Sequence, residues 1–254
     1  MNALAGKAVL VTGAARGIGA AIAEAVVDEG GSVALLDIDP AGADTAARLA
    51  DRGSAHFFLC DVQSLEQVER AVADAERTLG RFDGLVNNAG INAYFDAVTM
   101  SEDDWDRVFA VDLKAAWLLA KATLPGLIER RGAIVNMSSI QARLTIEGFF
   151  PYAAAKAGLE GLTRSLALDY GPAGVRVNAV APGYTDTRLV REWLDLQPDP
   201  EAALEGVLAR IALGRIADPS EIADAVVFLL SDRASAITGA TLAVDCGLGV
   251  RYAS

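Results

Sequence analysis

The chain has 254 residues, 52% of them hydrophobic, which favours one large domain over residues 1–254 rather than two small ones. The formal net charge of −12 argues against a nucleic-acid partner, because proteins that bind nucleic acid need a cationic face to displace counterions. The start of the chain lacks the features of a signal peptide, and no apolar run is long enough to span a membrane, so we expect a cytoplasmic protein with no membrane partner.

Short apolar runs alternate with longer helical patterns along the chain. Because the runs are continuously apolar, they predict strands that are buried on both faces. The strands are expected at residues 8–11, 32–36, 55–59, 84–86, 133–137, 175–180 and 241–244. The helices are expected at residues 18–29, 64–79, 101–106, 115–130, 152–170 and 219–230. This alternation predicts an α/β fold with a doubly wound parallel sheet, helices on both faces, and ligands beyond the carboxyl ends of the strands.

A glycine-rich segment, TGAARGIG at residues 12–19, joins the first expected strand to the first helix. Gly13 can make the tight turn out of the strand, Gly17 lets a ligand approach bare backbone, and Gly19 lets the helix pack closely on the sheet. The helix that starts near Ile18 presents free N–H groups and a dipole that favour a phosphate. The segment therefore predicts a dinucleotide site, and a loop that merely turns the chain is the alternative.

The second expected strand ends at Asp37, beyond the glycine-rich segment. A carboxylate there can accept hydrogen bonds from the ribose hydroxyls of adenosine and would repel a 2′-phosphate. Asp37 therefore predicts NAD rather than NADP. Arg16 is an opposing signal, because a basic residue in the glycine loop can bind that phosphate. The alternative for Asp37 is a solvated acid at the end of a strand.

The segment PYAAAK places Tyr152 and Lys156 four residues apart on one face of an expected helix. A free tyrosine is a poor base at neutral pH, but a nearby ammonium lowers its pKa, so Tyr152 could take a proton from an alcohol or return one to a carbonyl. The segment IVNMSS ends a buried strand and places Ser139 beyond its carboxyl end, where a hydroxyl can orient a substrate oxygen. Ser138 is the competing choice, and spacing alone does not separate the two.

The single histidine and the two cysteines limit other kinds of chemistry. His56 lies in an apolar, strand-like run, and Cys60 and Cys246 are far apart in the sequence. We therefore expect no Ser-His-Asp triad, no metal site and no disulfide framework.

Several motifs together resemble those of the short-chain dehydrogenase/reductase family, in order and spacing over residues 6–247. They are TGAARGIG, Asp61-Val62, NNAG at residues 87–90, the serines before YAAAK, and PGYTDT from Pro182. The resemblance implies a Rossmann-type fold with a seven-stranded sheet and a homotetramer. It also implies that Tyr152 is the acid/base, that Lys156 binds the nicotinamide ribose and lowers the tyrosine pKa, and that Ser139 orients the substrate. The cofactor contacts that it implies are Asp61 and Val62 at the adenine, Asn88, Ala89 and Gly90 at the ribose, and Pro182, Gly183, Thr185 and Thr187 at the nicotinamide amide.

One position departs from the family pattern. Asp112, in FAVDLKAAW, stands where the family has the asparagine of its proton relay. If only the backbone carbonyl holds the relay water, Asp112 can serve; if the amide side chain matters, the relay is altered.

Substrate contacts are expected from Asn92, Gln141, Arg143, Phe149 and Trp193, beneath a mobile lid at about residues 184–214. Polar groups suit the hydroxyls of a substrate and an aromatic face covers its C–H surface, whereas Arg143 could instead meet an anionic group. Trp193 could also pack in the core, as part of an apolar helix face.

This mixture predicts an NAD-dependent dehydrogenase of a sugar, polyol or similar small alcohol. The main alternative is a carbonyl reductase of 3-oxoacyl groups, steroids or other bulky ketones. A non-catalytic sensor of the NAD/NADH ratio is the third reading, and the presence of both Tyr152 and Lys156 argues against it.

Overall fold

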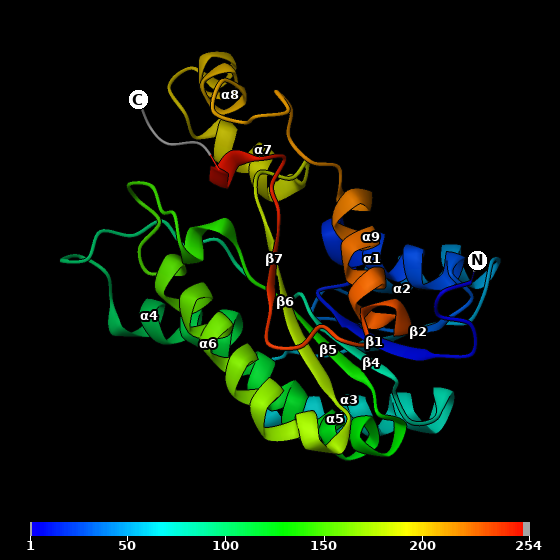
Figure 1. Ribbon diagram of the computed structural model, residues 1–254. Coiled ribbons are helices and arrows are strands. Elements are labelled where there is room, and N and C mark those ends of the chain that lie inside the picture. Colours follow the sequence, from blue (N-terminus) through cyan, green and yellow to red (C-terminus); the bar gives the residue numbers. More distant parts are fainter. Residues whose placement is uncertain (1, 251–254) are drawn as a thin grey trace.

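The computed structural model describes residues 2–250 and contains one sheet of seven strands (Figure 1). The strand order is β3-β2-β1-β4-β5-β6-β7, and all neighbouring strands are parallel. The strands are β1 (Ala8–Thr12), β2 (Ser32–Asp37), β3 (Ala55–Leu59), β4 (Gly84–Asn87), β5 (Ala133–Met137), β6 (Arg176–Pro182) and β7 (Thr241–Val244). Every predicted strand is present, and the predicted doubly wound α/β fold is confirmed.

The order of the strands creates the place for a ligand. From β1 the chain winds outward to β3, and it then returns to β4 and winds outward to β7 on the other side. The loops that follow β1 and β4 therefore leave the sheet in opposite directions. A crevice opens between them at the carboxyl ends of the strands, where doubly wound proteins bind their ligands.

Helices cover both faces of the sheet (Figure 1). Residues of α1, α2 and α9 pack on one face and residues of α3, α5 and α6 on the other, each around a separate apolar core. The helices are α1 (Gly17–Asp28), α2 (Gly42–Ala50), α3 (Leu65–Leu79), α4 (Glu102–Phe109), α5 (Ala115–Arg130), α6 (Tyr152–Tyr170), α7 (Arg188–Asp195), α8 (Pro200–Leu208) and α9 (Pro219–Leu230). Within residues 2–250, no helix has the length and apolarity needed to cross a membrane.

Helices α2 and α8 were not predicted, and α7 was expected only as the apolar helix face of the alternative reading of Trp193. Helix α2 has no side chain that caps its first turn, so its start carries no signal in the sequence. Helices α7 and α8 form the segment that was expected to be a lid. Side chains cap both of them, since Thr187 accepts a hydrogen bond from the N–H of Val190 and Asp199 accepts one from the N–H of Ala202. The mobility of this segment stays a prediction.

Candidate active site

A cavity of about 620 Å³ lies in the crevice at the carboxyl ends of the strands. It brings together segments that are far apart in the sequence, from the loop after β1 to helix α7. Most of the predicted cofactor residues line it: Gly13, Arg16, Gly17, Ile18, Asp37, Asp61, Val62, Asn88, Ala89, Gly90, Tyr152, Lys156, Pro182, Gly183, Thr185 and Thr187. Gly19 does not line the cavity. Because it has no side chain, the backbone at the start of α1 can approach the backbone of the glycine loop at Gly13.

The glycine loop is shaped by backbone conformations and contacts that exclude side chains. Gly13 and Gly17 have φ values of +63° and +57°, in the left-handed region that favours glycine. A Cβ atom on Gly19 would lie 2.1 Å from the carbonyl oxygen of Gly13. Helix α1 therefore starts directly against the loop.

The start of α1 suits an anion. No side chain caps its free N–H groups, and its first turn contains no acidic residue. Free N–H groups and the positive end of the helix dipole attract phosphate, and no carboxylate in that turn opposes it. The bare glycine backbone and the uncapped helix thus fit the pyrophosphate of a dinucleotide.

Two polar side chains join the glycine loop to the end of β4. The Thr12 hydroxyl accepts hydrogen bonds from the N–H groups of Asn88 and Ala89, both at 3.0 Å. The Asn88 amide donates to the carbonyl oxygens of Thr12 and Gly13, at 2.9 and 3.1 Å. The two walls of the crevice are therefore held at one spacing.

Asp37 lies at the end of β2 with its carboxylate held by the backbone. One oxygen accepts a hydrogen bond from the N–H of Ala15 and the other from the N–H of Asp39, both at 2.9 Å. Each oxygen keeps capacity for a further donor such as a ribose hydroxyl. Arg16 forms an ion pair with Asp39, which the sequence analysis did not foresee.

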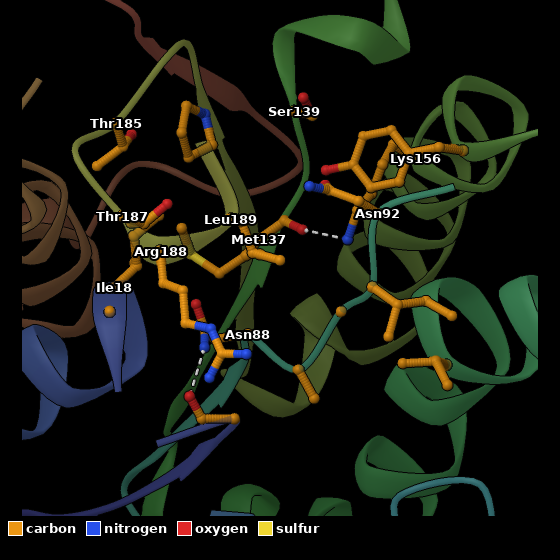
Figure 2. A pocket seen from close by; sticks show the side chains of 18 of the residues that line it. Ile18, Asn88, Asn92, Met137, Ser139, Lys156, Thr185, Thr187, Arg188 and Leu189 are labelled. Carbon is orange, nitrogen blue, oxygen red and sulfur yellow. Dashed lines mark hydrogen bonds between the residues drawn. The ribbon is translucent and has the colours of Figure 1, made fainter. Parts of the chain in front are cut away.

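Tyr152, Lys156 and Ser139 line the other end of the cavity, where Figure 2 labels Lys156 and Ser139. Tyr152 begins α6, and the Lys156 amine lies one turn later, 5.4 Å from the centre of the Tyr152 ring. That amine donates to the carbonyl oxygen of Met137 at 3.2 Å, as Figure 2 shows. Ser139 follows β5; its hydroxyl accepts a hydrogen bond from the N–H of Gln141 at 3.2 Å and acts to lower the pKa of Tyr152. The hydroxyl of Ser138 instead donates to the Lys156 carbonyl oxygen, which favours Ser139 as the residue that faces a substrate.

The charges around Tyr152 act in opposite directions. Burial raises the pKa of Tyr152, while the Lys156 ammonium and the Ser139 hydroxyl lower it; the net direction is upward. The Lys156 ammonium therefore acts on Tyr152 in the direction that the sequence predicted, and burial of the ring opposes it. Burial acts to lower the pKa of Lys156, and the neighbouring Asp112 carboxylate helps to reverse that effect, so the pKa of Lys156 rises.

Aromatic rings surround the part of the cavity beyond Tyr152. Phe149 lies edge-on to Tyr94 at 5.1 Å between ring centres and also to Tyr152 at 6.2 Å. Trp193 packs against Tyr184 at 5.5 Å and lines the cavity. Because α7 buries no residue, the alternative that Trp193 packs in the core is wrong.

The other predicted substrate residues divide into two groups. Asn92 and Gln141 line the cavity, and the side-chain oxygen of Gln141 also accepts a hydrogen bond from the N–H of Ile146. Arg143 is not among the lining residues. It donates to the buried carboxylate of Glu160 at 3.1 Å, so the structure gives no support to Arg143 as a substrate contact.

The sequence analysis missed further lining residues, among them Arg107, Tyr184, Arg188 and Glu192. Three of them lie within or just before α7. Their signals were a place in the segment expected to be a lid and the spacing of Arg188 and Glu192, which pair across one turn of that helix.

Comparison with known proteins places this geometry in a family. A family model described as enoyl-(acyl carrier protein) reductase matches residues 13–249. The 2-(S)-hydroxypropyl-CoM dehydrogenase 3 of Xanthobacter autotrophicus is 41% identical over 97% of this chain and 98% of its own length. A 3-oxoacyl-acyl-carrier-protein reductase of Thermotoga maritima is 38% identical over 96% of this chain and 98% of its own.

Solved structures agree with the sequence relatives. Ligand-free aldohexose dehydrogenase of Thermoplasma acidophilum superposes with a TM-score of 0.91 at 38% identity, and the match covers 99% of this chain and 97% of that one. The family match over most of the chain and the identity of these relatives show the class of protein. The chain belongs to the short-chain dehydrogenase/reductase family, and it is an oxidoreductase that acts on alcohol groups with a nicotinamide nucleotide, NAD or NADP.

Proposed function

We propose that the protein is an NAD-dependent dehydrogenase that oxidises a hydroxyl of a sugar, polyol or similar small alcohol. The observation that carries the choice of NAD is the carboxylate of Asp37, held by two backbone N–H groups at the adenosine end of the cavity. Arg16, the residue that would favour NADP, is paired with Asp39 and therefore less available to a 2′-phosphate. Relatives whose names specify a hydroxypropyl group and an aldohexose support a small hydroxylated substrate.

The bound dinucleotide supplies the hydride acceptor, and its proposed binding residues are the cavity-lining set given above. Ser139 holds the oxygen of the alcohol, and the Tyr152 phenolate takes the hydroxyl proton. The Lys156 ammonium stabilises that phenolate, and its hydrogen bond to the Met137 carbonyl fixes its position. The aromatic rings of Phe149 and Trp193 cover the carbon skeleton of the substrate, while Asn92 and Gln141 offer hydrogen bonds to its other hydroxyls.

A panel of aldoses, polyols, secondary alcohols and ketones tests the substrate class. Each compound is incubated with NAD or NADP, or with the reduced forms, and turnover is followed by the absorbance of reduced nicotinamide. We expect alcohol oxidation with NAD to give the highest kcat/KM. Turnover confined to 3-oxoacyl groups or bulky ketones with NADPH would favour the carbonyl reductase, and NAD binding without any turnover would favour a sensor.

Replacing Asp37 tests the cofactor choice. Asp37→Ala removes the carboxylate that would repel a 2′-phosphate, so the ratio of kcat/KM for NAD to that for NADP should fall at least about tenfold, or roughly 1.4 kcal/mol. The matched control is Asp44→Ala, which removes an exposed acid of α2 outside the cavity lining and should leave the ratio unchanged. A wild-type enzyme that prefers NADP would overturn the role given to Asp37.

Assembly as a homotetramer and a cytoplasmic location stay predictions. Light scattering on the purified protein measures the first, and cell fractionation measures the second.

A further inference from the structure

Asp112 is buried next to the catalytic lysine. It lies in a π-helical stretch, Ala110–Lys114, between α4 and α5, and its side chain is 0% exposed. One carboxylate oxygen lies 3.4 Å from the Lys156 amine and accepts a hydrogen bond from the N–H of Ile91 at 3.1 Å. A Cβ atom on Gly90 would lie 2.7 Å from that same oxygen, so the chain can approach Asp112 here only because it has glycine.

The second carboxylate oxygen faces a different environment. Among the described residues it has no hydrogen-bond partner, and the same holds for the side-chain oxygen of Asn87. Both residues line a small cavity of about 10 Å³ together with Thr12 and Ala89. Such a cavity approaches the room that one water needs, and a water there could donate to both acceptors. A proton on Asp112 itself is the other way to satisfy them.

The ammonium of Lys156 favours the ionised form of Asp112 over the protonated form. Its side chain is 5% exposed, and its hydrogen-bond acceptor at Met137 is neutral. A buried cation without a counter-ion is strongly unfavourable, and within residues 2–250 Asp112 is the carboxylate that acts on Lys156. We propose that Asp112 is a positioning residue, ionised at neutral pH, whose charge sets the pH at which the Tyr152–Lys156 pair becomes competent to accept the alcohol proton. The inference rests on the proposed alcohol oxidation.

The sign of the effect follows from the charges. The competent state forms when the protonated pair, a phenol and an ammonium, releases one proton to solvent. A negative charge nearby favours the protonated form of both groups, so it raises the first apparent pKa of the pair whichever group releases the proton. Tyr152 and Lys156 of α6 are the titratable groups that face Asp112. Strand β4 presents the neutral Asn87 amide, the segment after it presents the Ile91 N–H, and α5 presents Ala115 and Ala116. Burial raises the pKa of Asp112, and the Lys156 ammonium opposes that rise.

The test is the variant Asp112→Asn, which removes the charge and keeps the shape. In alcohol oxidation, kcat/KM rises with pH as the pair loses its proton. The midpoint of that rise should move at least about one pH unit lower in the variant. The matched control is Glu160→Gln. This variant likewise removes a buried carboxylate, but that carboxylate lies on α6 and pairs with Arg143. The midpoint of the pH dependence of kcat/KM should be the same in this variant as in the wild type.

A second measurement does not depend on turnover. NMR titration of the cofactor-free protein, labelled at the tyrosine ring and at the lysine side-chain terminus, follows both protons of the pair. The first of them should be lost at lower pH in Asp112→Asn than in the wild type. If no alcohol is oxidised but this shift is observed, the proposed function fails, while the effect of the Asp112 charge on the protonation of the pair stands.

A midpoint that stays unchanged in both measurements would show that Asp112 is neutral or uncoupled, and would overturn the proposal. If Asp112→Asn does not fold, Asp112→Ser removes the same charge with a smaller side chain and must move the midpoint in the same direction.

Discussion

Tyr152→Phe is expected to lower kcat by about a thousandfold or more, while NAD binding measured by calorimetry changes little. The substitution removes only the hydroxyl that we propose exchanges a proton with the substrate. The ring keeps its edge-on contact with Phe149, and Lys156 keeps its hydrogen bond to Met137. The loss should therefore appear in kcat rather than in the affinity for the cofactor.

Two other tyrosines serve as comparisons. Tyr170→Phe changes the far end of α6 and should leave kcat close to that of the wild type. Tyr94 lines the same cavity, but burial and its neighbours Tyr184 and Glu192 all act to raise its pKa, which reaches about 12, whereas the Lys156 ammonium opposes the rise at Tyr152. If Tyr94→Phe abolished turnover and Tyr152→Phe did not, the acid/base would be assigned to the wrong phenol.

Gly19→Ala should damage both stability and cofactor binding. The added methyl group would lie 2.1 Å from the Gly13 carbonyl oxygen and 2.6 Å from the Asn88 amide nitrogen, so α1 must move away from the loop. Forcing an extra carbon into a closed contact of this kind costs roughly 3 kcal/mol. Urea denaturation measures that loss, and we expect the Kd for NAD to rise at least about tenfold because the helix N-terminus shifts from the phosphate.

The matched control for this change is Gly206→Ala. Gly206 lies inside α8, and a Cβ atom there would meet nothing within 4 Å. Alanine is a better helix former than glycine, so this variant should be as stable as the wild type or more stable by up to about 1 kcal/mol. Equal stability and equal Kd for Gly19→Ala and Gly206→Ala would show that close packing of α1 on the loop is not required.

The parts of the fold that the sequence predicted are those whose signal is local. Each strand is a continuous apolar run because parallel strands are buried on both faces, and the glycines mark the loop where backbone approaches backbone. Helix α2 lacked such a signal, since its first turn has no capping side chain. Helix α7 begins at a capping threonine and has apolar residues at helical spacing, but the sequence analysis considered that spacing only as an alternative for Trp193.

The parts of the site that the sequence did not predict depend on ion pairs. The partners of such a pair are either distant in the chain or brought together by a backbone conformation that the sequence does not specify. Arg143 is a plausible substrate contact until folding places the buried Glu160 beside it. The same holds for the ion pair between Arg16 and Asp39, which alters how the glycine loop should be judged. The net direction of the Tyr152 pKa also depends on how deeply the ring is buried, and spacing along a helix carries no information on that.

Helices α7 and α8 bury only Val207 between them, and α7 contributes no residue to the apolar cores on either side of the sheet. Substitutions at exposed positions usually change stability by only a few tenths of a kcal/mol. Natural divergence or laboratory selection can therefore change the residues of α7 that line the cavity while the sheet and the glycine loop stay intact. Because the residues that line the cavity on α7 contribute little to stability, this fold can change its substrate without first being made more stable.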